Sequence, residues 1–289
     1  MKEGGKRYMK LTLTEAKKMM EANQGNLPLN CSGYTELPAG LIVDNWLELR
    51  CTRITKLPDG LLVGGGIDLR KSLITELPDN LVVGRVLDLS DTQITKLPDN
   101  LTVGTWINLS GTKITELPDT LTLGGPPNFI IGGPIRGFHG DTSHVKYLKN
   151  GEYVPGRYLY ADYVLTHVGR KKSFQNYDYY VGKIPGHNVI CDGTYYAHCS
   201  CIRNGTRDLS FKHAENRGAD QYRNISLNKQ IPTDELVTMY RVITGACLQG
   251  TELFLRSLGK LKDSYTIQEA VELTAGQYGN EEFKCFFEM

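Results

Sequence analysis

Four side chains that could bind zinc lie in the second half of the sequence, at His198, Cys199, Cys201 and His213. Thiolates and imidazoles are the usual zinc ligands, but structural zinc sites favour two cysteines separated by two residues, a spacing that this segment lacks. In a strand, Cys199 and Cys201 would share one face and His198 would lie on the other. The sequence therefore assigns no metal ligand and predicts no cofactor.

Cys247, in the segment TGAC, is a candidate nucleophile, because a thiol can act with a histidine that the fold brings close to it. Its neighbours are apolar and helically spaced, and a cysteine in such a helix usually belongs to the core. We therefore name no catalytic residue. An enzyme or effector with a thiol or metal site in the second half of the chain stays open as an alternative.

Tyrosines and basic residues alternate in the middle of the chain. Most of the 16 tyrosines fall within 147–196, among Arg170, Lys171, Lys172 and Lys183. Aromatic rings among cations can stack on single-stranded bases, which makes an RNA- or ssDNA-binding protein a second alternative. An ordinary tyrosine-rich sheet has the same composition, and no RNA-binding signature accompanies the rings.

Bulk composition is that of a globular protein of about two domains, with 289 residues and a formal net charge of +1. So small a net charge argues against strong nonspecific attraction to nucleic acid or membranes. The seven cysteines are an odd number without a regular framework, which predicts reduced thiols and a cytoplasmic protein. We expect no secretory signal and no membrane span, because no apolar run is long enough.

The first half of the sequence has a period of 20 residues. Leu-Pro pairs recur at 37–38, 57–58, 77–78, 97–98 and 117–118. A Leu-x-Leu core keeps the same phase, for example at Leu47/Leu49 and Leu87/Leu89. One unit has too few apolar positions to close a core, whereas stacked units share one. This predicts a solenoid of five copies over residues 27–126.

The repeated unit resembles the leucine-rich repeat in its short bacterial form, in which Leu-Pro occupies the second half. The resemblance implies a right-handed solenoid with one short parallel strand per unit in a concave sheet. Hydroxyl residues such as Thr52 stand where the family usually has asparagine, and we expect them to be structural. Glycines such as Gly64 and Gly104 are expected to form tight turns. A capping helix over 11–23 is predicted to begin after Thr14, within an N-terminal segment spanning residues 1–26.

The concave face of this solenoid is the predicted site. Side chains alternate along a strand, so the residues between the core leucines point away from the core. Three columns result: Trp46, Gly66, Val86 and Trp106; Glu48, Asp68, Asp88 and Asn108; Arg50, Arg70, Ser90 and Ser110. The two tryptophans of the chain lie about 14 Å apart if strands are spaced by 4.8 Å. Tryptophan is enriched at binding hot spots, and Gly66 is expected to leave room for a partner's side chain.

These columns lead us to predict a protein-binding module with an unidentified protein partner. The proposed site residues are Trp46, Glu48, Arg50, Asp68, Arg70, Val86, Asp88, Trp106 and Asn108. Each tryptophan could instead cover a turn or pack under a neighbouring domain. We favour a self-neutralising role for the acidic column beside the two arginines, the alternative being that it selects a positive charge.

The period ends after residue 126, and residues 127–146 predict a linker or cap closure. Residues 147–289 predict an α+β domain, a small antiparallel sheet followed by a helical bundle, which makes the chain α+β as a whole. Predicted strands are Tyr158–Thr166, Tyr177–Lys183, Asn188–Ile190 and Tyr195–Cys199. Predicted helices are Arg207–Asn216, Asp234–Ala246, Cys247–Leu258, Ile267–Ala275 and Glu281–Phe287, with Thr233 capping the second and Thr266 and Glu269 forming a capping box.

The segments GKIPG, RGADQY, MYRVITGAC and YTIQE resemble domains in repeat-bearing proteins of gut bacteria and phages. The resemblance implies that context, and with it an inhibitor or adaptor of a host protein. It assigns no catalytic residue.

Overall fold

A computed structural model describes residues 9–124, 134–162, 164–174 and 176–288. The chain divides into two compact units, Met1–Val189 and Ile190–Met289. The border lies within strand β19 (Asn188–Cys191), further along the chain than the domain limit at residue 146 that the sequence predicted.

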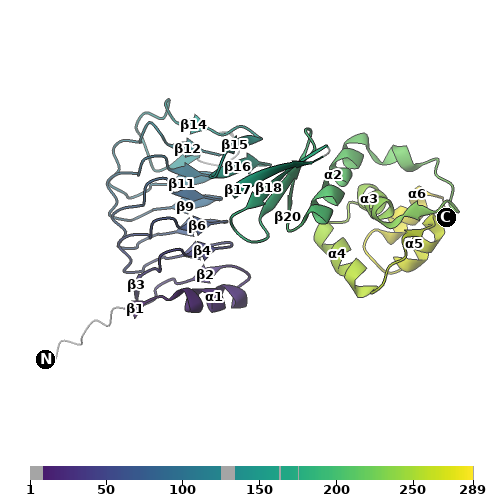
Figure 1. Cartoon of the computed structure of the whole chain (residues 1–289), viewed down its shortest axis with the longest axis horizontal. Helices are drawn as coiled ribbons and strands as arrows, with labels where there is room; N and C mark the ends of the chain where they lie inside the picture. Colours follow the sequence, from purple (N-terminus) through teal and green to yellow (C-terminus); the bar gives the residue numbers. More distant parts are fainter. Residues whose placement is uncertain (1–8, 125–133, 163, 175, 289) are drawn as a thin grey trace. The chain divides into compact units, whose positions relative to one another are not determined.

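The first unit contains a solenoid built from two six-stranded parallel sheets (Figure 1). Sheet I consists of β2 (Leu27–Pro28), β5 (Leu47–Glu48), β7 (Ile67–Asp68), β9 (Val86–Asp88), β11 (Trp106–Asn108) and β13 (Ile135–Arg136). Sheet II consists of β4 (Ile42–Val43), β6 (Leu62–Val63), β8 (Val82–Val83), β10 (Thr102–Val103), β12 (Thr122–Leu123) and β14 (Lys146–Tyr147). The expectation of one strand per repeat was wrong, because most turns contribute a strand to each sheet.

The 20-residue period sets the register of the stacked turns. Leu47 pairs with Ile67, and Ile67 with Leu87, so equivalent apolar residues lie directly above one another and are fully buried. The hydroxyls of Thr52 and Thr92 each donate a hydrogen bond of 2.7 Å to the backbone carbonyl three residues earlier. Together with the equivalent Thr112, these hydroxyls hold the turns that follow β5, β9 and β11.

The glycine column next to sheet II is required by close approach of the backbone. A Cβ atom on Gly104 would lie 1.9 Å from the carbonyl oxygen of Gly84, and one on Gly84 would lie 2.0 Å from that of Gly64. Gly64, Gly84 and Gly104 lie in the short bends between a sheet II strand and the next sheet I strand, as predicted, but none of them has a positive φ, so close approach and not a left-handed conformation requires glycine. Turns stack here at a distance that leaves no space for a side chain.

Helix α1 (Leu13–Ala22) contacts β2 and buries Ala16. Its N-cap is Thr12, and not Thr14 as predicted. The Thr12 hydroxyl accepts from the Glu15 backbone N–H at 3.2 Å, while the Glu15 carboxylate accepts from the Thr12 N–H at 2.9 Å. This reciprocal capping box satisfies two backbone donors, so the helix begins one residue after Thr12. The preceding strand β1 (Met9–Lys10) pairs in parallel with β3 (Tyr34–Glu36).

The range predicted as a linker, residues 127–146, supplies further strands to the solenoid. Ile135 pairs with Ile107 in sheet I, and Lys146 pairs with Thr122 in sheet II. The part of this range up to residue 133 lies outside the described residues.

An antiparallel sheet follows, with the order β15-β16-β17-β18-β19-β20 (Figure 1). Its remaining strands are β15 (Glu152–Val154), β16 (Tyr158–Ala161), β17 (Val164–Phe174), β18 (Tyr177–Gly182) and β20 (Tyr196–Cys199). The predicted strand Tyr158–Thr166 is two strands, and β17 continues eight residues beyond its expected end. Within the first unit, Tyr160 and Leu165 of this sheet pack with Val82 of sheet II.

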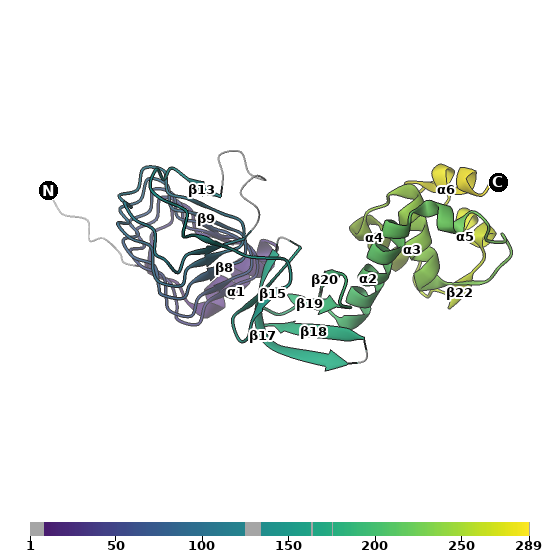
Figure 2. The ribbon, with the colours of Figure 1, turned by 90° about the horizontal axis from the view of Figure 1, so that it is seen from above.

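The second unit is helical after β20 (Figure 2). It contains α2 (Ile202–Arg217), a 3-10 turn (Ala219–Tyr222), α3 (Thr233–Thr244), α4 (Leu248–Ser257), α5 (Ile267–Leu273) and α6 (Asn280–Phe286), with a short pair of strands, β21 (Ile231–Pro232) and β22 (Ser264–Tyr265). Met239 and Phe283 are fully buried at its centre. The predicted capping box of Thr266 and Glu269 is confirmed at α5, whereas Pro232 precedes α3 in place of the predicted Thr233 cap. No helix in the described ranges is long and apolar enough to cross a membrane.

Candidate functional site

The outward face of sheet I carries the predicted columns. Leu47 and Leu49 point into the core, so Trp46 and Glu48 are half-buried and Arg50 is exposed. Asp68 and Asp88 lie on the same face yet are only 8% and 9% exposed. Their neighbours on the face explain this burial.

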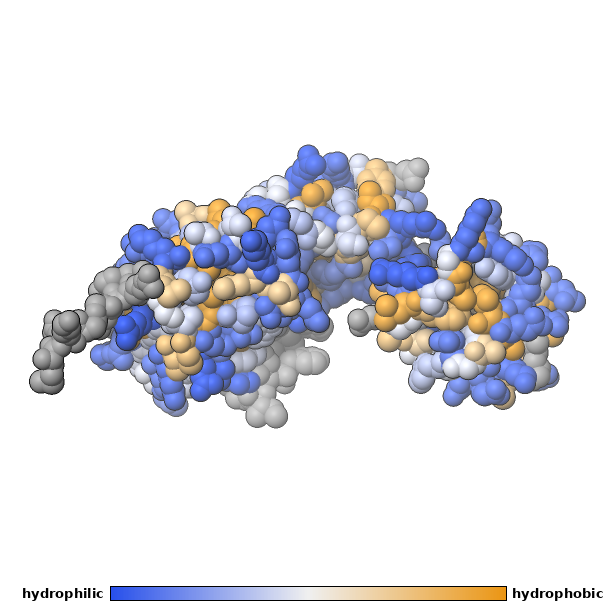
Figure 3. Space-filling view, turned by 90° about the horizontal axis from the view of Figure 1, so that it is seen from below, coloured by the Kyte–Doolittle hydropathy of each residue, from blue (hydrophilic) through white to orange (hydrophobic). Residues whose placement is uncertain are grey.

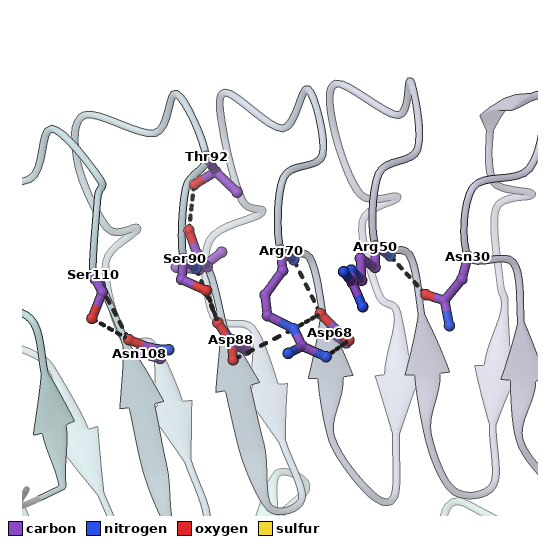
Figure 4. A network of polar contacts seen from close by, with 10 residues as sticks. Asn30, Arg50, Asp68, Arg70, Asp88, Ser90, Thr92, Asn108 and Ser110 are labelled. Atoms are coloured by element: carbon purple, nitrogen blue, oxygen red, sulfur yellow. Dashed lines mark hydrogen bonds and ion pairs between the residues drawn. The ribbon is translucent and has the colours of Figure 1, made fainter.

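Three side chains of the second column, Asp68, Asp88 and Asn108, bind the backbone at the end of their own strand (Figure 4). The Asp88 carboxylate accepts from the Ser90 backbone N–H at 3.0 Å and from the Ser90 hydroxyl at 2.7 Å. The Asn108 side-chain oxygen accepts from the equivalent two groups of Ser110. These three residues therefore close the turns after β7, β9 and β11, and this backbone contact accounts for Asp or Asn at this phase of the repeat.

Arg70 binds the two aspartates of the acidic column. Its Nε and terminal nitrogen donate to the two Asp68 carboxylate oxygens at 2.9 and 2.7 Å, and Nε lies 3.8 Å from Asp88 (Figure 4). The hydrogen bonds with Asp68 raise the pKa of Arg70 above its ordinary value. Glu48 is bound separately, by the Asn30 amide at 2.6 Å. Arg70 thus offsets one negative charge of the column, and full self-neutralisation of the column stays a prediction.

The two tryptophans are held by different contacts. A Cβ atom on Gly66 would lie 2.5 Å from Cζ3 of Trp46, so the indole lies across the glycine and fills the space that we expected a partner to occupy. The Arg136 guanidinium carbon lies 4.2 Å from the centre of the Trp106 ring, which makes a cation–π contact. Both rings are half-buried, and half-buried Val86 pairs with Trp106 across the strands.

Arg136 was missed by the sequence analysis because it lies 28 residues after Asn108, its partner in the register, and not 20. The sequence signal that could have identified it is the pair Ile135-Arg136, an apolar residue followed by a polar one, as in the earlier sheet I strands. Arg50 was predicted, and its guanidinium forms no ion pair with any residue of the described ranges. It is therefore free to meet an acidic group.

The zinc-type residues of the second half are dispersed. Cys199 is buried beneath α2, where burial raises the pKa of its thiol to about 11. His213 binds Asp192 at 2.7 Å and contacts the Tyr195 ring edge-on. Within the ranges described, no three His, Cys, Asp or Glu side chains are grouped closely enough to hold a metal ion.

Cys247 is exposed and caps α4, with its sulfur accepting from the Gly250 backbone N–H at 3.3 Å. The expectation that it belongs to the core was therefore wrong. It borders a cavity of about 210 Å³ between α3, α4 and α5, lined by apolar side chains such as Leu236 and Phe254. Figure 3 shows hydrophobic side chains gathered on one face of this unit. The Tyr240 hydroxyl of the lining is bonded within the chain, donating to the Tyr278 carbonyl at 2.8 Å.

The chain matches no known family model, no curated protein and no solved structure.

Proposed function

We propose that the chain is a protein-binding module whose solenoid is of the leucine-rich-repeat type and is closed at its start by α1. Support comes from the 20-residue register, the stacked apolar columns and the threonine hydroxyls that hold three of the turns. A bacterial or phage origin, and a role as inhibitor or adaptor of a host protein, rest on the resemblance of the sequence alone.

The observation that carries this proposal is the pair of tryptophans that pack against neighbouring residues on the outward face of sheet I. Trp46 rests on the Gly66 backbone and Trp106 against Arg136, so each ring has a packing contact within the solenoid before a partner arrives. Rigid aromatic anchors reduce the entropy that binding would otherwise cost. Because Arg70 already pairs with Asp68 and lies near Asp88, recognition depends on these rings and on Arg50 rather than on the acidic column.

The test compares the wild type with the Trp46→Ala, Trp106→Ala double variant. A bacterial lysate is used first to capture partners, which mass spectrometry identifies. A purified partner is then titrated calorimetrically against both proteins. We expect a one-to-one complex with the wild type and an affinity at least a hundredfold lower with the variant, because two hot-spot rings contribute about 3 kcal/mol or more together.

A matched control removes two exposed apolar side chains outside the columns, Leu13 and Leu73, which are 51% and 50% exposed. The Leu13→Ala, Leu73→Ala variant should bind like the wild type. Equal affinity of wild type and tryptophan variant would exclude the outward face of sheet I as the binding surface.

A further inference from the structure

The end of the β17–β18 hairpin projects past its neighbour β16. Strand β16 pairs with β17 only as far as His167, while the pairing with β18 continues from Arg170 to Phe174. We call the paired segments Arg170–Phe174 and Tyr177–Val181 the β17–β18 ribbon (Figure 2). A register shift between Val168 and Arg170 precedes it.

On one face of the ribbon the charged side chains pair with each other, and we call it the closed face. Lys171 and Tyr180 are opposite each other, as are Ser173 and Asp178. The Lys171 ammonium lies 2.7 Å from the Asp178 carboxylate and 5.5 Å from the centre of the Tyr180 ring. Hydrogen bonding between the pair raises the pKa of Lys171 and lowers that of Asp178. Every charge on this face has a partner.

The opposite face is basic and aromatic. Side chains alternate along a strand, so this face carries Arg170, Lys172 and Phe174 from β17 and Tyr177, Tyr179 and Val181 from β18. Arg170 and Lys172 are exposed, and neither forms an ion pair within the described ranges. The rings are half-buried, with those of Phe174 and Tyr177 6.0 Å apart at the end of the ribbon. No acidic residue belongs to this face.

We propose that this face of the β17–β18 ribbon binds single-stranded nucleic acid. Arg170 and Lys172 stand two residues apart, roughly 7 Å along the strand, and would meet successive phosphates. The three rings beside them would stack on bases, the combination typical of sequence-tolerant single-strand binding. The two positive charges favour a polyanion as the ligand. The rings favour a single strand, whose bases are exposed, over a duplex, whose bases are already stacked on one another.

The charged residues are distributed unequally between the two faces of the ribbon, which distinguishes it from an ordinary tyrosine-rich pair of strands. Three consecutive cations, Arg170, Lys171 and Lys172, lie on β17, and Asp178 is the acid opposite them. That acid neutralises the middle cation and leaves the outer two together. The result is one neutral face and one face with two adjacent positive charges.

The experiment measures fluorescence anisotropy of labelled 12-nucleotide oligo-U and oligo-dT with the full chain. Two phosphate contacts predict a slope of about −1.4 in log affinity against log salt, so affinity should fall about sevenfold between 50 and 200 mM salt. The Arg170→Gln, Lys172→Gln variant should bind at least tenfold more weakly and lose most of the salt dependence. Tighter binding of oligo-U identifies RNA as the ligand, and tighter binding of oligo-dT identifies DNA.

The control has the same net charge. Lys171→Gln with Lys149→Gln removes one cation from the closed face and one exposed cation outside the ribbon, and should keep wild-type affinity. Tyr179→Ala should weaken binding roughly tenfold with an unchanged salt slope, because it removes stacking and no charge. Circular dichroism of each variant verifies that the sheet is intact.

Three results would overturn the proposal. The first is the absence of binding to either oligonucleotide at 20 mM salt. The second is an equal loss in the Lys171, Lys149 control. The third is equal or tighter binding of polyglutamate or of a duplex, which would show that charge alone is recognised. The Trp46, Trp106 variant should bind oligonucleotides normally, which separates this surface from the outward face of sheet I.

Discussion

At the scale of single residues, the most unusual environment is that of His167 in β17. Its side chain is only 2% exposed, and Nε2 lies 3.0 Å from the backbone carbonyl oxygen of Val63 in sheet II. A carbonyl can only accept, so the neutral ring carries its proton on Nε2 and donates it there. Burial lowers the pKa of His167 to about 4, from an ordinary value of 6.5.

This shifted pKa predicts how stability depends on pH. The unfolded chain binds the His167 proton more tightly, so stability is complete above pH 6.5 and is lost as pH falls toward 4. The loss approaches about 1.4 kcal/mol per pH unit and totals roughly 3 kcal/mol. His187, half-buried and also of lowered pKa, adds a smaller loss of the same sign.

Urea unfolding between pH 7 and 4 measures this effect. His167→Gln keeps a donor for Val63 without a titrating ring, so its stability should vary less with pH than that of the wild type. His139→Gln, at an exposed position, should follow the wild-type curve. Parallel curves for wild type and His167→Gln would refute the assignment.

At the scale of elements, the glycine column joins sheet II to the antiparallel sheet. A Cβ atom on Gly104 would lie 3.1 Å from that of Leu165, and one on Gly124 would lie 2.7 Å from the Tyr160 ring. The same glycines allow the solenoid turns to stack closely. One column of the repeat therefore serves both the stacking and the packing of β16 and β17.

Replacing Gly104 by Ala should destabilise the solenoid by about 3 kcal/mol or more, because the methyl group meets backbone that cannot move aside. Gly60→Asn is the matched control. Gly60 has nothing within 4 Å of its Cβ position and a φ of 69°, and Asn80 and Asn100 adopt the same conformation at the equivalent position of the next two turns. The control should change stability by less than about 1 kcal/mol. Similar losses in both variants would contradict the steric role.

The sequence predicted those elements whose residues repeat at a constant interval. The core columns and the outward columns can be predicted from the residue types within a single repeat. The start of α5 can be predicted from its capping-box residues. Strands β13 and β14 were missed because the interval changes there. The end of β17 was missed because Gly169 and three cations interrupt its apolar pattern. The position of the Trp46 ring and its contact with Gly66 depend on packing between turns, which no single repeat reveals.

At the scale of the whole molecule, the two units have separate cores. The solenoid core is built from leucine, isoleucine and valine columns, whereas the helical unit packs aromatic rings such as Tyr240 against Phe283, with ring centres 4.9 Å apart. Both tryptophans of the chain lie in the solenoid. Within the described ranges, five of the six α-helices, α2 to α6, lie in the second unit.

These locations allow one protein to report the unfolding of its two units separately. Tryptophan fluorescence follows the solenoid, and circular dichroism at 222 nm follows mainly the helices of the second unit. Phe283→Ala removes a fully buried ring and should cost about 3–5 kcal/mol in that unit. We expect the dichroism transition in urea to move to lower concentration while the fluorescence transition stays in place. Leu89→Ala, in the solenoid core, should do the reverse. If either variant shifted both transitions equally, the chain would unfold as one cooperative body, and the separation of the cores would carry no thermodynamic meaning.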